Sequence, residues 1–357
     1  MRAWRLVSGV VLSLSIAPSI GIRAANCGPE GKVRFVCGVT SPEDLVAIPG
    51  TDWIVVSGFE RGGALHVVNT RNDRTVQVFP ASAPRIRPDS RGFPACPGPP
   101  DPAEKEEFSA HGLNVRPGPD GIHTVYVVHH GFRESIEVFQ VDRRTPTTFT
   151  WVGCVIAPDS AVFNSVAPLP DGGLVATNSY GHDPEARVRA PRGIDSGEVW
   201  EWHTAGGWKI VPGSETPGPN GIEVSRQGNW LYVNLWPVRK IMRLSRGQIP
   251  IRRDVIDVPF HPDNIRWQPD GSLLSAGHDA PPPIERTREC LRVKCANASA
   301  KVVQIDPEKF TFHEIVNYPS NDVFFGATSA LQVGKEIWLG SVRGDRIARI
   351  PPELRAR

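Results

Sequence analysis

Polar side chains open five of six similar segments of this sequence, and the residues beside them are mostly Leu, Val, Ile and Gly. The openings are Glu43, His111, Asn164, Asn220 and the adjacent pair Asp263 and Asn264. If the fold brings them together, two carboxylates and three amides offer oxygen ligands with a charge of −2. This set suits Ca²⁺, which takes about six to eight oxygens, better than Mg²⁺, which demands a tighter octahedron and keeps several waters. We therefore predict a bound Ca²⁺ with positions left for water or substrate.

A local role is the alternative for these residues. Asn and Asp at the start of a strand commonly bond to their own backbone in a turn. Their recurrence at the same phase of successive segments favours a shared site instead.

Two histidines stand at the ends of one predicted hairpin: His111 opens its first strand and His130 closes its second. Antiparallel pairing brings such positions to the same end of the hairpin. A neutral imidazole can take a proton from water, and a second imidazole can orient it or relay the proton. We predict that His111 and His130 are catalytic and that the neighbouring His129 is structural.

The elements that must position these residues form a repeat of a short strand, a turn rich in Pro, Gly and Asp, and a second, more apolar strand. The six copies read EDLVAIPGTDWIVVSG from Glu43, HGLNVRPGPDGIHTVYVVHH from His111, NSVAPLPDGGLVATN from Asn164, NGIEVSRQGNWLYVNLW from Asn220, DNIRWQPDGSLLSAGH from Asp263 and ATSALQVGKEIWLGSV from Ala327. One or two further alternating strands follow each copy, which fits propeller blades of about 40–50 residues with insertions. We predict an all-β fold, a six-bladed β-propeller with four-stranded blades.

The N-terminal part is expected to close the ring. The last copy supplies three strands, whereas a strand-like piece over residues 32–39 precedes the first copy. Pairing this piece with the last blade would satisfy an open edge. In a propeller the first strand of each blade lines the central channel, so the polar openings converge on one mouth. Two packed β-sandwiches are the alternative, because six similar hairpins can also be arranged that way.

The first residues predict export. Arg2 and Arg5 precede an apolar run over residues 6–17, and Ala24 and Ala25 suit cleavage. We predict a signal peptide over residues 1–25 and a single propeller domain over residues 26–357, in a secreted or periplasmic protein. No transmembrane segment is expected after cleavage, because no later stretch approaches about 18 apolar residues.

Six cysteines in an exported chain favour disulfides. The sequence does not fix their pairing. Short separations favour Cys27 with Cys37 and Cys290 with Cys295, which leaves Cys96 with Cys154.

The charges exclude nucleic acid as a partner: 40 Lys and Arg face 38 Asp and Glu, without runs of one sign. A small molecule is expected instead. Three insertions, over residues 81–108, 180–197 and 276–299, are predicted to emerge on the face of the polar ring and to form a lid over it.

Several motifs resemble the paraoxonase/arylesterase group, within the gluconolactonase-like superfamily of six-bladed propellers. They are HGLNVRPGPDGIHTVYVVHHG, FNSVAPLPDGGLVATN, GPNGIEVSRQGNWLYV, DNIRWQPDGSLLSAGH and the early SPEDL. The resemblance covers nearly all of the chain after the signal peptide. It implies hydrolysis of lactones and aryl esters, with a catalytic calcium held by residues matching Glu43, Asn164, Asn220, Asp263 and Asn264. The histidine pair of the group, which gluconolactonases lack, matches His111 and His130.

The sequence also departs from that group. A second, structural calcium of the group uses an Asp where Ser165 stands here, although Asp44 keeps the other carboxylate and is a possible ligand of a second metal. Tyr180 replaces a pocket histidine and His278 matches a further one, so both are pocket candidates. The disulfide that joins the chain ends in the group cannot form, because the last cysteine is Cys295.

Together these inferences predict an exported, calcium-dependent hydrolase whose partner is a small-molecule ester or lactone. Calcium would polarise the carbonyl group and the histidine pair would activate water. A propeller enzyme of the strictosidine-synthase kind, which lacks the calcium ring, is one alternative. A non-enzymatic propeller that binds a ligand on its loop face is the other.

Overall fold

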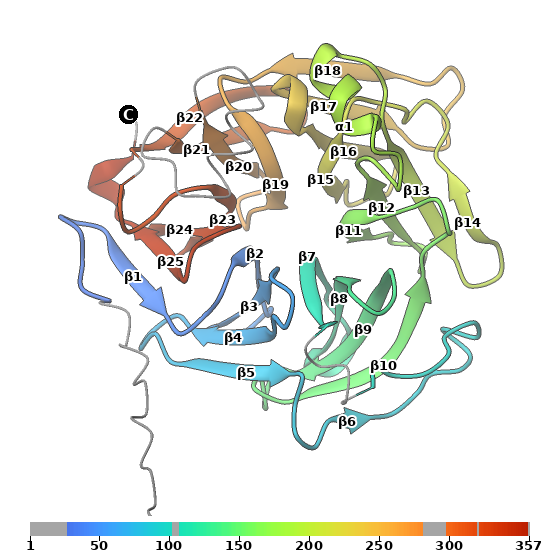
Figure 1. The fold of residues 1–357 in the computed structure, drawn as a ribbon, viewed down its shortest axis with the longest axis horizontal. Coiled ribbons are helices and arrows are strands. Elements are labelled where there is room, and N and C mark those ends of the chain that lie inside the picture. Colours follow the sequence, from blue (N-terminus) through green and yellow to red (C-terminus); the bar gives the residue numbers. More distant parts are fainter. Residues whose placement is uncertain (1–26, 102–106, 281–297, 320, 356–357) are drawn as a thin grey trace, which may run out of the picture.

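The computed structural model describes residues 27–101, 107–280, 298–319 and 321–355. The predicted signal peptide, Cys290 and Cys295 lie outside these residues. The described residues form six sheets around a common centre, and one strand of each sheet faces that centre (Figure 1). The predicted six-bladed β-propeller is therefore confirmed, and the alternative of two packed sandwiches is wrong. No helix in these ranges is long and apolar enough to cross a membrane.

The blades follow one another along the chain. Blade one contains β2 (Pro42–Ala47), β3 (Trp53–Gly58), β4 (Leu65–Asn69) and β5 (Thr75–Phe79); blade two contains β7 (Ser109–Arg116), β8 (Ile122–His130), β9 (Ser135–Asp142) and β10 (Phe149–Ile156). Blade three contains β11 (Phe163–Pro168), β12 (Leu174–Asn178), β13 (Glu198–His203) and β14 (Gly207–Ile210); blade four contains β15 (Pro219–Val224), β16 (Trp230–Leu235), β17 (Lys240–Ser245) and β18 (Arg253–Asp257). Blade five contains β19 (His261–Trp267), β20 (Leu273–Asp279), β21 (Ser299–Asp306) and β22 (Thr311–Tyr318); blade six contains β23 (Ala327–Val333), β24 (Glu336–Ser341), β25 (Arg346–Ile350) and β1 (Arg34–Cys37). Short helical turns lie in the connections: η2 (Pro119–Gly121), α1 (Ala186–Arg189), η3 (Ala190–Arg192), η4 (Trp236–Val238) and η5 (Pro352–Leu354).

Blade six closes the ring as predicted. Its strand β1, from the N-terminal part of the chain, pairs antiparallel with β25, with Phe35 opposite Ala348. Figure 1 shows β1 lying beside β25 at the junction between the two ends of the ring. The N-terminal strand thereby covers the edge that the last blade would otherwise expose.

Blade two differs from the prediction by one strand. The short strand β6 (Arg85–Ile86), from the first insertion, pairs parallel with the outer strand β10 and adds a fifth strand to the sheet. A disulfide between Cys96 and Cys154 ties this insertion to β10, and a second disulfide joins Cys27 to Cys37. Two of the three expected pairs are therefore formed, and the third lies outside the described residues.

The apolar core lies between neighbouring blades. One cluster joins blade one to blade two through Val55, Leu113 and Val127, and a similar cluster joins blade four to blade five through Ile241 and Ile265. Burial of a side chain of this kind contributes roughly 1.5–3 kcal/mol. Because this packing occurs between the sheets, polar residues can occupy the inner strands near the axis.

Every inner strand contains a β-bulge at the same place, where two of its residues oppose one residue of the next strand. The two bulged residues are Glu43 and Asp44, His111 and Gly112, Asn164 and Ser165, Asn220 and Gly221, Asp263 and Asn264, or Thr328 and Ser329. Bulges leave a residue unpaired and redirect its side chain. The six bulges therefore turn every predicted ring residue out of the regular ladder at one end of the channel.

Two of these bulges require glycine. A Cβ atom on Gly221 would lie 2.4 Å from the Asp263 carbonyl oxygen and 2.6 Å from the Asn264 Cα atom. A Cβ atom on Gly112 would similarly lie 2.5 Å from the Asn164 carbonyl oxygen. Backbone atoms cannot move aside as a flexible side chain can, so glycine at these places allows the next inner strand to approach closely.

Candidate active site

A pocket of about 730 Å³ lies at the end of the channel where the inner strands begin. The predicted site residues that line it are Glu43, His111, His130, Asn164, Tyr180, Asn220, Asp263 and His278. Asn264 lies behind this surface, and its amide donates a hydrogen bond of 2.7 Å to Glu43 Oε1. The structure thus brings together the predicted ring and the predicted histidine pair, which come from five different blades.

The ring presents oxygen atoms that lack partners. Three buried oxygens of the ring have no hydrogen-bond donor among the described residues: Glu43 Oε2, Asn164 Oδ1 and Asn220 Oδ1. Buried polar atoms almost always find a partner, so unsatisfied acceptors from three separate blades need a donor or a cation. Their amide and carboxylate chemistry is what a hard cation such as Ca²⁺ selects.

The ring is also electrostatically unfavourable without a cation. Burial, together with the neighbouring carboxylates Asp263 and Asp44, raises the pKa of Glu43 well above its usual range. Burial and Asp44 raise the pKa of Asp263 in the same way, although a hydrogen bond from Asn220 opposes the shift. A bound cation would reverse both shifts by neutralising the charges.

The ring would not be found by a search for acidic and histidine ligands. No group of three or more His, Cys, Asp or Glu side chains in the described part of the chain is arranged to hold a metal ion. The ring contains two carboxylates and takes its remaining oxygens from amides, which is a donor set that Ca²⁺ accepts. The residues present therefore fit calcium, although the fit depends on Asn164, Asn220 and Asn264.

The two predicted histidines are in contact. His111 Nδ1 lies 3.0 Å from His130 Nε2, and His111 Nε2 lies 3.4 Å from Asn164 Nδ2. Phe59 packs against His111 with a ring separation of 4.1 Å. Burial, aided by the neighbouring His130, lowers the pKa of His111 well below its usual range. His111 is therefore a neutral imidazole at neutral pH, as a general base must be.

A carboxylate that the sequence analysis missed completes this cluster. Glu134 Oε2 accepts a hydrogen bond of 2.7 Å from His130 Nδ1. Glu134 lies in the turn between β8 and β9, four residues after His130, and no motif marks it. Since it follows the histidine in the same hairpin, a search for acids within the turn would have been the available signal.

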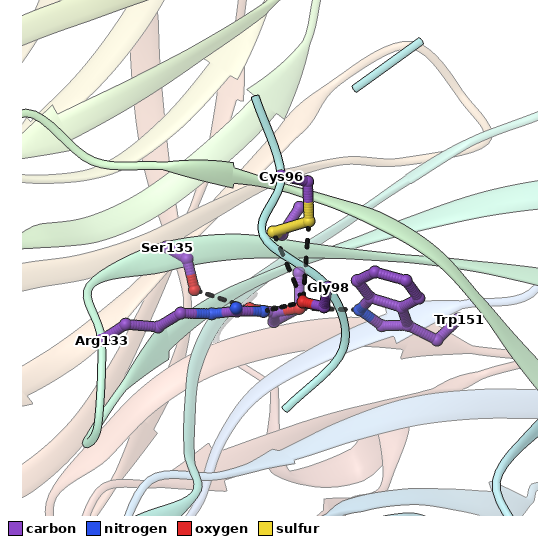
Figure 2. Close-up of a disulfide and its surroundings, with 7 residues drawn as sticks. Cys96, Gly98, Arg133, Ser135 and Trp151 are labelled. Atoms are coloured by element: carbon purple, nitrogen blue, oxygen red, sulfur yellow. Dashed lines mark hydrogen bonds and ion pairs between the residues drawn. A yellow bond between two sulfur atoms is a disulfide. The ribbon is translucent and has the colours of Figure 1, made fainter. Parts of the chain in front are cut away.

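The turn that carries Glu134 is fixed from behind. Arg133 donates hydrogen bonds to the buried carboxylate of Glu137, at 2.6 Å from Nη2, and to the Gly98 carbonyl at 3.0 Å. Figure 2 shows Gly98 between the Cys96 disulfide and the guanidinium of Arg133. The disulfide-linked insertion therefore braces the β8–β9 turn from the outer side of blade two.

One of the three insertions that are predicted to form a lid lines the pocket with several residues. Residues 180–197 contribute Tyr180, Gly181 and Arg187 to the pocket, and the Arg187 guanidinium lies 4.5 Å from the centre of the Tyr180 ring. Of the described residues in the insertion over residues 81–108, Glu107 alone lines the pocket, because the short strand of this insertion follows the outer strand of blade two. The described part of this insertion therefore does not cover the pocket as predicted, and residues 102–106 lie outside the described residues. Most of the third insertion lies outside the described residues.

Two further histidines have structural contacts. His278 is buried, its Nδ1 lies 3.1 Å from the Ala327 carbonyl oxygen, and burial lowers its pKa to about 4. His129 Nδ1 lies 3.0 Å from the Arg133 carbonyl oxygen, and burial lowers its pKa to about 3. His129 thus has the structural role expected of it, whereas His278 is a neutral group at the pocket wall.

Asp44 points away from the pocket and is fully engaged by the protein. Its Oδ2 accepts hydrogen bonds from the Leu113 amide at 2.8 Å and from Arg266 Nη2 at 2.7 Å, and its Oδ1 accepts one from the Leu45 amide. Arg266 also reaches Glu223, at 3.1 Å. The guanidinium of Arg266 thus occupies the place beside Asp44 where the sequence suggests a second metal. This role of Arg266 was not predicted from the sequence.

Comparison with known proteins defines the fold. No protein-family model matches the chain, and no curated protein matches it. Solved structures do match it over most of their length. A luciferin-regenerating enzyme has a TM-score of 0.56 and 12% identity over 91% of this chain and 95% of its own. A gluconolactonase-like family protein has a TM-score of 0.54 and 14% identity over 90% and 93% of the two chains.

A third match is the PQQ-bound aldose sugar dehydrogenase of Streptomyces coelicolor, with a TM-score of 0.52 and 15% identity over 90% of this chain and 99% of its own. At sequence identities this low, the three matches show a shared fold and nothing more. The molecule is therefore a six-bladed β-propeller with an oxygen-rich ring and a histidine pair at one mouth of its channel.

Proposed function

We propose that this protein is an exported, calcium-dependent hydrolase of lactones or aryl esters. The observation that carries the proposal is that a buried ring of unsatisfied oxygens and the contacting pair His111 and His130 line one pocket. The two disulfides are consistent with an oxidising compartment.

The chain offers a specific set of ligands for the ion. Those that would hold it are Glu43, Asn164, Asn220, Asp263 and Asn264. Calcium bound there would polarise a carbonyl oxygen and stabilise the negative charge that develops on it. Three hydrogen bonds fix the backbone of this set: Thr328 and Ser329 donate to the Glu43 carbonyl at 2.6 and 2.8 Å, and Asn234 donates to the Asp263 carbonyl at 2.9 Å.

The histidine pair supplies the base. His111 faces the ring, with its Nε2 3.9 Å from Glu43 Oε1, so a water molecule in the pocket can meet both the base and the carbonyl carbon. His111 takes the proton of that water as the oxygen attacks, and His130 holds His111 from the other side. Phe59 covers the imidazole and limits its contact with bulk solvent.

The test is a set of lactones and aryl esters assayed with calcium and after chelation. His111→Gln should reduce turnover by roughly 10²–10⁴ while calcium affinity stays close to that of the wild type, because an amide cannot accept the proton. His129→Gln is the matched control, since this buried histidine neighbours the pair without facing the pocket. Normal turnover of both substrate classes by a His111→Gln, His130→Gln double variant would contradict the histidine mechanism.

A further inference from the structure

Glu134 and His130 form a carboxylate–imidazole pair beside the proposed base. Their side chains are 28% and 17% exposed, and the oxygen to nitrogen distance is 2.7 Å. We propose that Glu134 is a positioning residue, which completes a Glu134–His130–His111 chain and determines which nitrogen of His111 accepts the proton. This inference rests on the proposed hydrolytic function and adds a third member to its catalytic apparatus.

The two hydrogen bonds fix the tautomers one after the other, first that of His130 and then that of His111. A carboxylate only accepts hydrogen bonds, so His130 carries its proton on Nδ1, and its Nε2 is then an acceptor when the ring is neutral. His111 Nδ1, at 3.0 Å, must therefore be the donor to that Nε2. A neutral imidazole has one N–H group, so His111 Nε2 is left with a lone pair on the pocket side, where Asn164 Nδ2 lies 3.4 Å away and can donate to it.

Loss of the carboxylate would remove this preference. His130 could then place its proton on Nε2 and donate to His111 Nδ1, so that the proton of His111 would lie on Nε2. That nitrogen could no longer accept a proton from water. Glu134 therefore selects the active tautomer, as the carboxylate of a catalytic triad does for its histidine.

The carboxylate also compensates the charge that forms during turnover. When the water oxygen bonds to the carbonyl carbon, its proton passes to His111 Nε2 and His111 becomes an imidazolium. Glu134 stabilises this positive charge through His130. The proton then passes to the leaving oxygen as its bond to the carbonyl carbon breaks, and His111 returns to the neutral state.

The turn geometry supports a role that depends on position. The Glu134 carbonyl accepts a hydrogen bond from the Ala157 amide at 3.0 Å, and Arg133 is anchored to Glu137. A Cβ atom on Gly131 would lie 1.9 Å from the Glu107 carbonyl oxygen, so the turn lies tightly against the preceding loop. The backbone on both sides of Glu134 is thereby fixed, which holds its carboxylate against His130.

Calcium-loaded wild type, Glu134→Gln and Glu134→Ala should be compared on one lactone and one aryl ester. We expect kcat to fall by about 10- to 100-fold in both variants, with KM changed less than about twofold, because the carboxylate acts on the base and not on substrate binding. Added acetate should restore part of the kcat of Glu134→Ala, since the position is partly open to solvent. The control is Glu60→Gln, an exposed carboxylate between Phe59 and Arg61 of the pocket wall, which should behave like the wild type.

Histidine ¹⁵N spectra supply a readout that needs no substrate. Wild type should show His111 with its proton on Nδ1, and Glu134→Gln should show a mixture of tautomers or the Nε2–H form. Unchanged tautomers together with unchanged kcat in the Glu134 variants would overturn the inference, while a loss of activity in His111→Gln would leave the proposed function standing. If the wild type hydrolyses neither substrate, the proposed function fails, and the tautomer measurement alone decides the role of Glu134.

Discussion

Arg266 Nη2 donates a hydrogen bond of 2.7 Å to Asp44 Oδ2, although the two residues are 222 positions apart and belong to blades five and one. The same guanidinium reaches Glu223 of blade four at 3.1 Å, and all three side chains are buried. One buried cation thus links the inner strands of three blades directly beneath the proposed calcium ring. Glu43 and Asp263 are the carboxylates of the ring, and Arg266 compensates Asp44 and Glu223, two buried carboxylates outside the ring.

Arg266→Met should therefore destabilise the protein by about 3–5 kcal/mol, because it leaves buried carboxylates without their counter-charge. Urea unfolding in saturating calcium would measure this effect. Arg34→Met is the control: Arg34 pairs with Glu336 but is 59% exposed, so its loss should cost less than about 1 kcal/mol. In a double-mutant cycle, Asp44→Asn with Arg266→Met should cost less than the sum of the two single changes. Strict additivity would show that the pair is not coupled.

Calcium removal should lower both stability and activity. The ion would bind the folded chain in preference to the unfolded one, and a ligand at about 100 times its Kd adds about 2.7 kcal/mol to the free energy of unfolding. One ion per chain is expected, because Arg266 already neutralises Asp44. Calorimetric titration would give the stoichiometry, and thermal unfolding with and without chelator would give the stabilisation. Asp263→Asn should bind no calcium in the titration, and chelator should leave its melting temperature unchanged.

The pH dependence of that stabilisation follows from the ring carboxylates. Without the ion, the pKa values of Glu43 and Asp263 are raised, so the folded calcium-free protein binds more protons than the unfolded one and loses stability as the pH rises. Calcium replaces those protons. Chelation should therefore lower the melting temperature more at pH 8 than at pH 5.5, and an equal effect at both would argue against ionised ligands.

How much the sequence reveals depends on whether a feature repeats. The six blades and the ring residues could be predicted because each recurs at the same phase of a strand, and the closing strand because the last repeat lacks one. Arg266 could not be predicted, since its partner Asp44 is distant in sequence and nothing in its own strand marks a buried charge. Glu134 was missed for another reason: its function depends on the direction of one side chain in a turn. Thr328 and Ser329 occupy the sixth bulge but contact Glu43 by their hydroxyls, and so they did not match the amide and carboxylate pattern.

Glycine at the bulge of blade four should be required for the site as well as for the fold. In Gly221→Ala the new methyl group would lie 2.4 Å from the Asp263 carbonyl oxygen, so β19 must move outward or the β15 bulge must change. We expect a loss of about 1–3 kcal/mol in the free energy of unfolding, as in other overpacked sites, together with weaker calcium binding. Gly206→Ala is the matched control, because a Cβ atom on Gly206 would meet no other atom within 4 Å. Unchanged calcium affinity in Gly221→Ala would contradict the close approach of these strands.

His278 should make the protein sensitive to acid. Burial lowers its pKa to about 4, whereas an unfolded histidine titrates near 6.5. Between these values the unfolded state binds a proton that the folded state refuses, so the contribution of His278 to stability is complete above about pH 6.5 and is lost as the pH falls toward 4. Relative to His278→Gln, the wild type should lose up to about 3 kcal/mol of unfolding free energy over this interval.

Urea unfolding of both proteins in saturating calcium, from pH 7.5 to pH 4.5, would measure the difference, and the values above pH 7 give the baseline. Because the two proteins share every other titrating group, the carboxylate contributions largely cancel. A difference that stays constant with pH would mean that the His278 imidazole is charged in the folded protein or that it can reach solvent.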